Sequence, residues 1–152
     1  MSIEGQKFYP GETATPQQVV LLANEYRCAA EALRNTGRRR EPISLAPYRF
    51  VAIHAIELYL NAVLLAAGHP SAKLRGLQHD LASRTKFAPI SKLCLRTRTL
   101  KHLQRLSETR EYLVTRYDPA TSAASQLNRL AATLNEVAEK VTGLLVPAAK
   151  QP

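Results

Sequence analysis

One segment constrains the fold of this chain more than any other, the run YRFVAIHAIELYLNAVLLAAG at residues 48–68. Its strongly polar residues are only Arg49, His54, Glu57 and Asn61. A helix that is apolar nearly all round lies buried in a core. His54, Glu57 and Asn61 recur at spacings of three and four, so they share one helical face. Because an unpaired buried polar group costs about 1–3 kcal/mol, we expect a polar network inside the core.

The composition favours helices over sheets. The 152-residue chain has no Trp and three Phe, so Leu, Ala and Val supply most of the core. No stretch alternates apolar and polar residues for long enough to predict a strand. The length fits one domain. We therefore expect an all-α chain with an N-terminal arm at 1–14, a single helical domain at 15–147 and a short tail at 148–152.

Local signals set the first helix boundaries. Thr15 is expected as an N-cap, Pro16 as the first helical residue and Gln18 as the partner in a capping box, with the helix ending near Asn35. A second helix is expected over 47–67, ended by Gly68. A loop should follow at 74–78, then a short helix from about His79 and a break at 87–90.

The second half predicts two longer helices. One should begin near Ser91 and continue to Tyr117 with a kink near Ser107, stopped by Asp118-Pro119. Its inward residues are expected to be Leu93, Leu100, Leu103 and Leu106. Thr121 or Ser122 should cap the last helix. An apolar seam then follows at Leu127, Leu130, Leu134, Val137, Val141 and Leu144, suited to packing within the bundle or to a dimer contact.

Two observations bear on compartment. Cys28 and Cys94 form no CxxC pair, and the N-terminal MSIEGQKFYP is too polar for a signal peptide. We therefore expect reduced, buried thiols in a cytoplasmic protein. Residues 47–67 approach the length of a membrane span, but the charges within them are expensive in lipid, so no membrane association is expected.

Positive charge is concentrated in one segment of the chain. The net charge is +9, and residues 73–105 hold nine Lys or Arg against the single acid Asp80. A second basic run lies at 38–40. Clustered positive charge is typical of a protein with a polyanionic partner, and equally of a solvated basic face with none.

Three segments resemble one known family. They are HAIELYLNAVLLAAG at 54–68, LQHDL at 77–81 and YLVTRYDP at 112–119. In order and spacing they resemble the HEPN (higher eukaryotes and prokaryotes nucleotide-binding) helical domains. Such members carry a His-Ala-Ile/Leu-Glu helix, a Gly-His-Asp-Leu turn and an Arg-Tyr-Pro at a helix end. Here Gln78 stands where the family tends to have Gly, and Asp118 separates Tyr117 from Pro119.

The resemblance implies an antiparallel four- to five-helix bundle, often dimeric, with one long buried central helix. It also implies a metal-independent ribonuclease or a toxin-type component. The family signature has four to six residues between an Arg and the His that follows it. Arg49 and His54 have that spacing, but on one helix they point about 140° apart. The pairs Arg75–His79 and Arg98–His102 are each one residue too short.

The catalytic candidates are His102, His79, His54 and Glu57. His54 and Glu57 form either an acid–base pair or a satisfied core hydrogen bond, with Glu57 paired to an Arg such as Arg116. His79 is either a general base or part of a helix cap, and His102 is either a proton donor beside Arg98 or part of a solvated face.

The candidates for binding phosphate or nucleic acid are Arg75, Arg96, Arg98, Lys101, Arg105, Arg116 and Tyr117. Arg116 and Tyr117, with Tyr112 close by in the sequence, either stack on a base or nucleotide or form a structural corner that needs no ligand.

Motifs for dinucleotide binding, P-loops, serine hydrolases and zinc are absent from the sequence, so no cofactor or metal is expected. The sequence therefore predicts a HEPN-like domain that binds RNA or a nucleotide through a basic face. The alternative is a non-catalytic module that binds a protein partner through its last helix or forms a homodimer.

Overall fold

The computed structural model describes residues 8–120 and 124–146. Within these ranges the regular structure is helical, which confirms the all-α class. The strand-type pairing in this part of the chain is one isolated bridge between Arg38 and Glu41. The expected cap at Thr121 or Ser122 and the tail at 148–152 lie outside the described residues.

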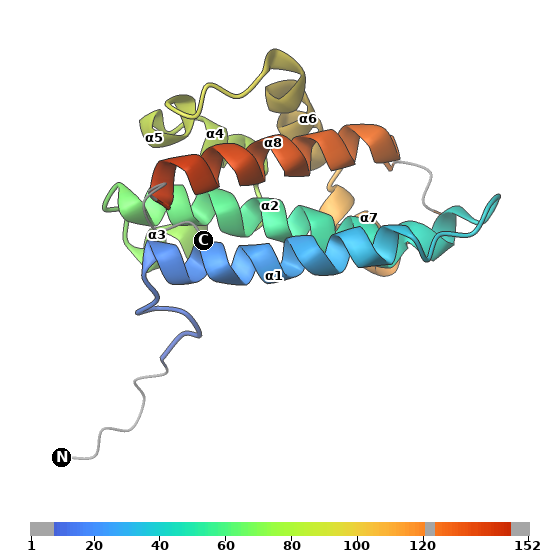
Figure 1. Ribbon diagram of the computed structural model, residues 1–152, viewed down its shortest axis with the longest axis horizontal. Coiled ribbons are helices and arrows are strands. Elements are labelled where there is room, and N and C mark those ends of the chain that lie inside the picture. Colours follow the sequence, from blue (N-terminus) through green and yellow to red (C-terminus); the bar gives the residue numbers. More distant parts are fainter. Residues whose placement is uncertain (1–7, 121–123, 147–152) are drawn as a thin grey trace.

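Three long helices form the body of the bundle: α1 (Pro16–Arg34), α2 (Ala46–Ala66) and α8 (Leu127–Leu145). Each packs against the other two. α2 runs antiparallel to α1, whereas α8 runs in the same direction as α2 (Figure 1). The helices between α2 and α8 return the chain to the end where α2 begins. The expected antiparallel order therefore holds for α1 with either neighbour, but not for α2 with α8.

The predicted start of α1 is confirmed atom by atom. The Thr15 hydroxyl accepts the Gln18 N–H at 3.1 Å, and the Gln18 side chain accepts the Thr15 N–H at 2.9 Å. Two orphan donors of the first turn are thereby satisfied. At the end of α2, Gly68 has φ +96°, a left-handed conformation that terminates the helix at low steric cost.

The middle of the chain is more broken than its apolar pattern predicts. α3 (Ser71–Gly76) and α5 (Ala88–Ser91) occupy stretches expected to be loop or break, with α4 (Leu81–Thr85) between them. The helix expected from Ser91 is two helices, α6 (Thr97–Glu108) and α7 (Glu111–Tyr117).

The break between α6 and α7 lies at Arg110, whose φ of +52° no α-helix accommodates. The chain leaves α7 at Asp118, as predicted. The kink expected near Ser107 is therefore a full break between two helices, a few residues further along the chain.

Several side chains lie elsewhere than expected. Leu103, Leu106 and the central seam of α8 are buried, whereas Leu100 is 39% and Leu144 is 53% exposed. Cys28 and Cys94 are both exposed free thiols, so the prediction of buried thiols is wrong. At the last turn of α8 the residue packed against the core is Leu145, four positions after Val141, so Leu144 lies beside the seam.

Residues Pro42–Ala66 are long and apolar enough to cross a membrane by length and composition alone. Just over half of the most apolar window, 56%, is buried against the rest of the protein. Core helices of soluble proteins share this property, and the absence of membrane association stays a prediction.

Candidate functional site

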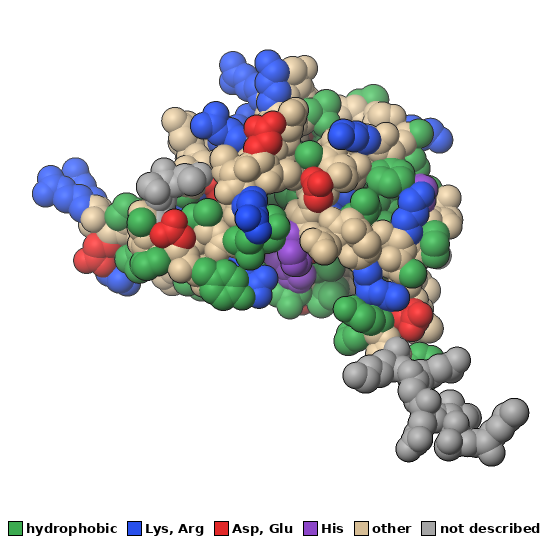
Figure 2. Space-filling model, turned by 180° about the vertical axis from the view of Figure 1, so that it is seen from behind, with side chains coloured by type: hydrophobic (Ala, Val, Ile, Leu, Met, Phe, Trp, Pro, Cys, Tyr) green, Lys and Arg blue, Asp and Glu red, His purple; other side chains and the backbone are tan. Residues whose placement is uncertain are grey.

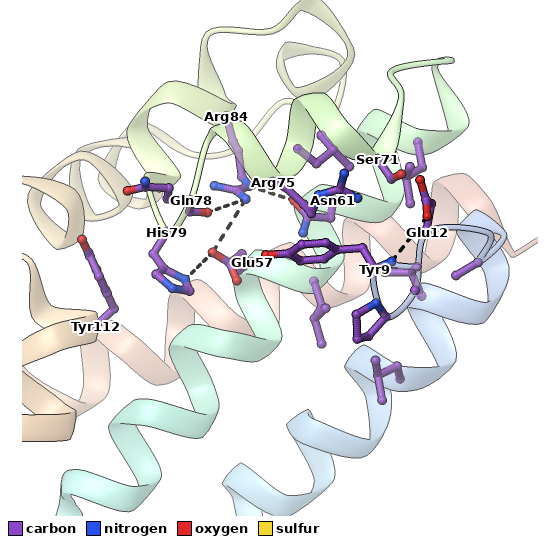
Figure 3. Close-up of a pocket in the computed structure, with 18 of the residues that line it drawn as sticks. Tyr9, Glu12, Glu57, Asn61, Ser71, Arg75, Gln78, His79, Arg84 and Tyr112 are labelled. Carbon is purple, nitrogen blue, oxygen red and sulfur yellow. Dashed lines mark hydrogen bonds and ion pairs between the residues drawn. The ribbon is translucent and has the colours of Figure 1, made fainter. Parts of the chain in front are cut away.

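Glu57 lies at the centre of the site. It projects from α2 and is 8% exposed. Its Oε1 is 3.0 Å from Nδ1 of His79, and its Oε2 is 3.7 Å from Nδ1 of His54. Oε1 also lies 3.7 Å from Nη2 of Arg84 (Figure 3). The structure therefore brings together three of the four catalytic candidates, His54, Glu57 and His79.

Arg84 is the buried cation that faces this carboxylate. Its side chain is 1% exposed, and its Nε donates to Oδ1 of Asn61 at 2.8 Å. Its two terminal nitrogens donate to the carbonyl oxygens of Asp80 at 3.0 Å and of Gln78 at 2.8 Å. The expected polar network in the core is thus present. The cation that faces Glu57 is Arg84, however, and the pairing with Arg116 is wrong.

Glu57 is ionised at neutral pH. Burial acts to raise its pKa, but the contact with His54, the charge of Arg84 and the contact with His79 together hold that pKa below its ordinary value. A carboxylate only accepts hydrogen bonds, so Nδ1 of His79 is the donor. In neutral His79 the proton therefore sits on Nδ1, and Nε2 is left as an acceptor.

Local backbone geometry places His79 beside α2. Gln78 has φ +51°, a left-handed conformation that ends the turn after α3. Asp80 then caps α4, because its two oxygens accept the backbone N–H and the hydroxyl of Ser83 at 3.0 and 2.7 Å. The same bonds from Ser83 lower the pKa of Asp80. His79, between these fixed neighbours, packs its ring 4.9 Å from that of Tyr112.

A row of aromatic and cationic side chains borders the site. The Arg116 guanidinium lies 5.3 Å from the ring centroids of both Phe50 and Tyr117. Phe50 stacks near His54 at 6.4 Å, and His54 meets Tyr26 edge-on at 4.6 Å. Tyr117 is 71% exposed. We call Phe50, Arg116 and Tyr117 the stacking row.

Two hollows meet at the Glu57–His79 pair. A shallow groove is lined by Phe50, Ile53, His54, Glu57, His79, Leu81, Tyr112 and Arg116. On the other side of the pair, a cavity of about 700 Å³ extends between α1, α2, α3 and residues 9–14. Figure 2 shows the molecule from behind, with histidine near the centre of the face in view and separate Lys and Arg side chains around it.

His102 is not part of this site. It is 5% exposed between α6 and α8, with Nδ1 2.7 Å from the Thr133 hydroxyl. Burial, helped by the charges of Arg129 and Arg105, lowers the pKa of His102 to about 4. Nε2 has no hydrogen-bond partner among the described residues. The expectation that His102 shares an exposed face with Arg98 is therefore wrong.

The other basic candidates divide between two regions. Arg75 lines the cavity and Arg116 lines the groove. Arg96, Arg98, Lys101 and Arg105 are exposed on or just before α6, and none of them lines either hollow. Arg49 donates to the carbonyl of Ser125 at 2.5 Å, so it holds the chain before α8 and is not paired with His54.

The sequence does not mark Arg84, Phe50 or Tyr9 as site residues. The ring of Tyr9 lies 4.1 Å from the Arg75 guanidinium. Arg84 belongs to a five-residue helix and carries no pattern that marks it as buried. Among the described residues, no group of three or more His, Cys, Asp and Glu is placed to hold a metal ion.

No protein-family model, no curated protein and no solved structure matches this chain.

Proposed function

We propose that this chain is a HEPN-like domain that binds single-stranded RNA along the groove beside Glu57 and cleaves it without a metal ion. One observation carries the proposal. An ionised carboxylate lies between two imidazoles at a small groove, about 20 Å³ in volume, that is edged by Arg116. This arrangement supplies a base, an acid and a positive charge within one small region.

The chemistry assigned to these groups is an internal phosphoryl transfer. Nε2 of neutral His79 accepts the proton of an RNA 2′-hydroxyl, and the freed oxygen attacks the adjacent phosphorus. The bond from phosphorus to the 5′-oxygen breaks, and protonated His54 donates a proton to that oxygen. The products are a 2′,3′-cyclic phosphate and a 5′-hydroxyl. Arg116 offsets the charge that develops on the phosphate.

The stacking row supports RNA in single-stranded form. Unpaired bases stack on exposed aromatic rings, at about 1–3 kcal/mol per base. Phe50 and Tyr117 present such rings, each 5.3 Å from the Arg116 guanidinium. Bases on the two rings would leave the intervening phosphate near Arg116 and the histidines.

The contacts of the site also support the family resemblance. Segments 54–68, 77–81 and 112–119 carry the resemblance, and they supply Glu57, His79 and Arg116, which line one groove. Gln78 adopts the left-handed conformation that glycine prefers, at the position where the family tends to have Gly.

The test incubates the protein with single-stranded RNA in EDTA and follows cleavage products on gels. His79→Ala and His54→Ala should each lower the rate by about 10²-fold or more. His69→Ala is the matched control, because His69 packs against Phe87 away from the groove. DNA of the same sequence should stay intact, since it has no 2′-hydroxyl. RNA cleavage that persists in His79→Ala, or that requires a divalent ion, would refute the assignment.

The binding surface is tested separately by filter retention of RNA at low and high salt. Phe50→Ala with Arg116→Ala should weaken retention more than Arg98→Ala with Lys101→Ala, because only the first pair lines the groove. The reverse order would move the RNA site to α6.

The alternative is an interaction or dimerisation module that uses exposed leucines. Leu21 on α1 is 64% exposed, and Leu144 near the end of α8 is 53% exposed. Exposed leucines of this kind are typical of contact surfaces when they adjoin one another. Size-exclusion chromatography with light scattering of wild type and Leu21→Ser tests this alternative directly, and a monomer at all concentrations would remove the homodimer.

A further inference from the structure

One wall of the 700 Å³ cavity is an aromatic ring from the chain itself. Tyr9 projects from the segment before α1, and its ring lies 4.1 Å from the Arg75 guanidinium. Figure 3 shows this ring extending across the cavity, with its hydroxyl pointing toward Glu57. A planar ring with a hydrogen-bond donor at one edge therefore fits between Arg75 and the carboxylate.

Tyr9 is weakly held in this place. It is 57% exposed, although it lies against the cavity. Its segment folds on itself, with Glu12 N–H to the Tyr9 carbonyl at 3.0 Å and Tyr9 N–H to the Glu12 carboxylate at 3.4 Å. Gly11, at φ +80°, provides the turn. None of these bonds reaches α2 or α3, so the segment can move without breaking them.

The polar end of the cavity presents complementary groups one helical turn apart. Glu57 is an ionised acceptor, and among the described residues the hydrogen bond to its carboxylate comes from His79, to Oε1 at 3.0 Å. Asn61 accepts from Arg84 through Oδ1, which turns its Nδ2 donor group away from Arg84. Leu22, Leu58 and Leu65 supply an apolar wall. A guanine edge, with two adjacent N–H donors and one carbonyl, matches a carboxylate beside an amide donor.

We propose that this cavity binds a guanine base stacked on Arg75, and that Tyr9 covers the stacking face of Arg75 when no base is bound and is displaced from that face by the base. The base belongs either to a free nucleotide or to RNA, and in the second case the inference deepens the proposed function. The Arg110 guanidinium, which lines the same cavity and makes no ion pair within the described residues, is placed to meet a phosphate.

Because Tyr9 covers the binding site, removing its ring should change the affinity for the base. Simple binding to the protein surface predicts no such change. The ring contact of Tyr9 must be broken before a base takes its place, and an exposed cation–π contact is worth enough to change affinity ~2- to 5-fold. Tyr9→Ala should therefore bind the base more tightly than wild type. Arg75→Ala should bind it more weakly, because the stacking surface is lost.

The experiment is isothermal titration calorimetry of the full chain with guanosine 5′-monophosphate and adenosine 5′-monophosphate. We expect the guanine nucleotide to bind more tightly than the adenine nucleotide, and Tyr9→Ala to strengthen its binding ~2- to 5-fold. Phe8→Ala is the control within the same segment, and Lys73→Ala is the control for a cation on α3 outside the cavity. Both controls should bind as wild type does.

The outcomes separate this inference from the proposed function. No binding of guanosine 5′-monophosphate to Tyr9→Ala, or equal binding by Tyr9→Ala and wild type, overturns the inference even if RNA is cleaved. A preference for the adenine nucleotide overturns the choice of base. Guanine binding that responds to Tyr9 and Arg75 supports the inference even when no RNA is cleaved. An effect of Tyr9→Ala on RNA retention, absent in Phe8→Ala, assigns the base to RNA.

Discussion

Removing the Glu57 carboxylate should destabilise the fold through the charge that it leaves behind. Arg84 is 1% exposed, and its remaining partners are neutral oxygens of Asn61, Gln78 and Asp80. At the 3.7 Å separation of Glu57 and Arg84, an effective dielectric of about 20 gives an attraction of roughly 4–5 kcal/mol. Breaking a buried pair by removing one partner typically costs about 3–5 kcal/mol.

We expect Glu57→Ala to lower the free energy of unfolding by ~3 kcal/mol, because the neutral oxygens still satisfy the guanidinium donors. The measurement is urea unfolding at pH 7, followed by far-UV circular dichroism. Glu139→Ala, an exposed glutamate on α8, is the matched control and should stay within about 0.5 kcal/mol of wild type.

A double-mutant cycle measures how strongly the charges of Glu57 and Arg84 are coupled. Glu57→Gln and Arg84→Met should each destabilise the protein, but the double variant should cost less than their sum by more than ~1 kcal/mol. Additive effects, or a Glu57→Ala cost below ~1 kcal/mol, would show that the two charges are not coupled.

The pKa of Glu57 is lowered in the folded state, so its contribution to the free energy of unfolding is present above the unfolded pKa of about 4.3 and is lost as pH falls through the folded pKa.

Three further predictions concern other sites. Burial in the folded protein lowers the pKa of His102 from its ordinary value of 6.5 to about 4. With respect to this group, the folded state is therefore fully stable above pH 6.5 and loses stability as the pH falls below that value. By pH 5 the loss should reach ~2 kcal/mol, and urea titrations should show it in wild type and in His69→Asn but not in His102→Asn. Gln78→Gly should raise stability by about 0.5–1 kcal/mol, because glycine relieves the left-handed backbone, and a lower melting temperature would contradict this. Thr15→Ala should cost ~1 kcal/mol by removing the capping box, as read from the urea midpoint.

The sequence predicts most of the long-range architecture here and little of the middle. Capping residues and apolar period define α1 and α2, because both signals are local to the helix. The turn at Arg110 has no capping signal of this kind, and the sequence predicts it only as a kink near Ser107. Its left-handed conformation is imposed by tertiary packing, and an Arg carries no preference for it. The same applies to α3 and α5, which are too short for a period to emerge.

The site was predictable in part. The stripe of His54, Glu57 and Asn61 already indicates a buried polar face, since helical spacing alone aligns them. Which cation meets that face depends on how α4 packs, and spacing along the chain does not reveal it. His102 misleads for a related reason. Its neighbours on α6 are basic, but its own position in the helical period points inward, where burial keeps the imidazole neutral.

The two exposed thiols have a practical consequence for handling this protein. Cys28 on α1 and Cys94 ahead of α6 are both reachable from solvent. In buffer without a reductant, thiols from separate molecules will join as disulfides, and the resulting covalent dimers will imitate a native homodimer in any sizing experiment. The same accessibility offers two attachment points for dyes or spin labels on the unaltered sequence. Serine replacement at one position would then leave a single labelled site for following motion of the helices.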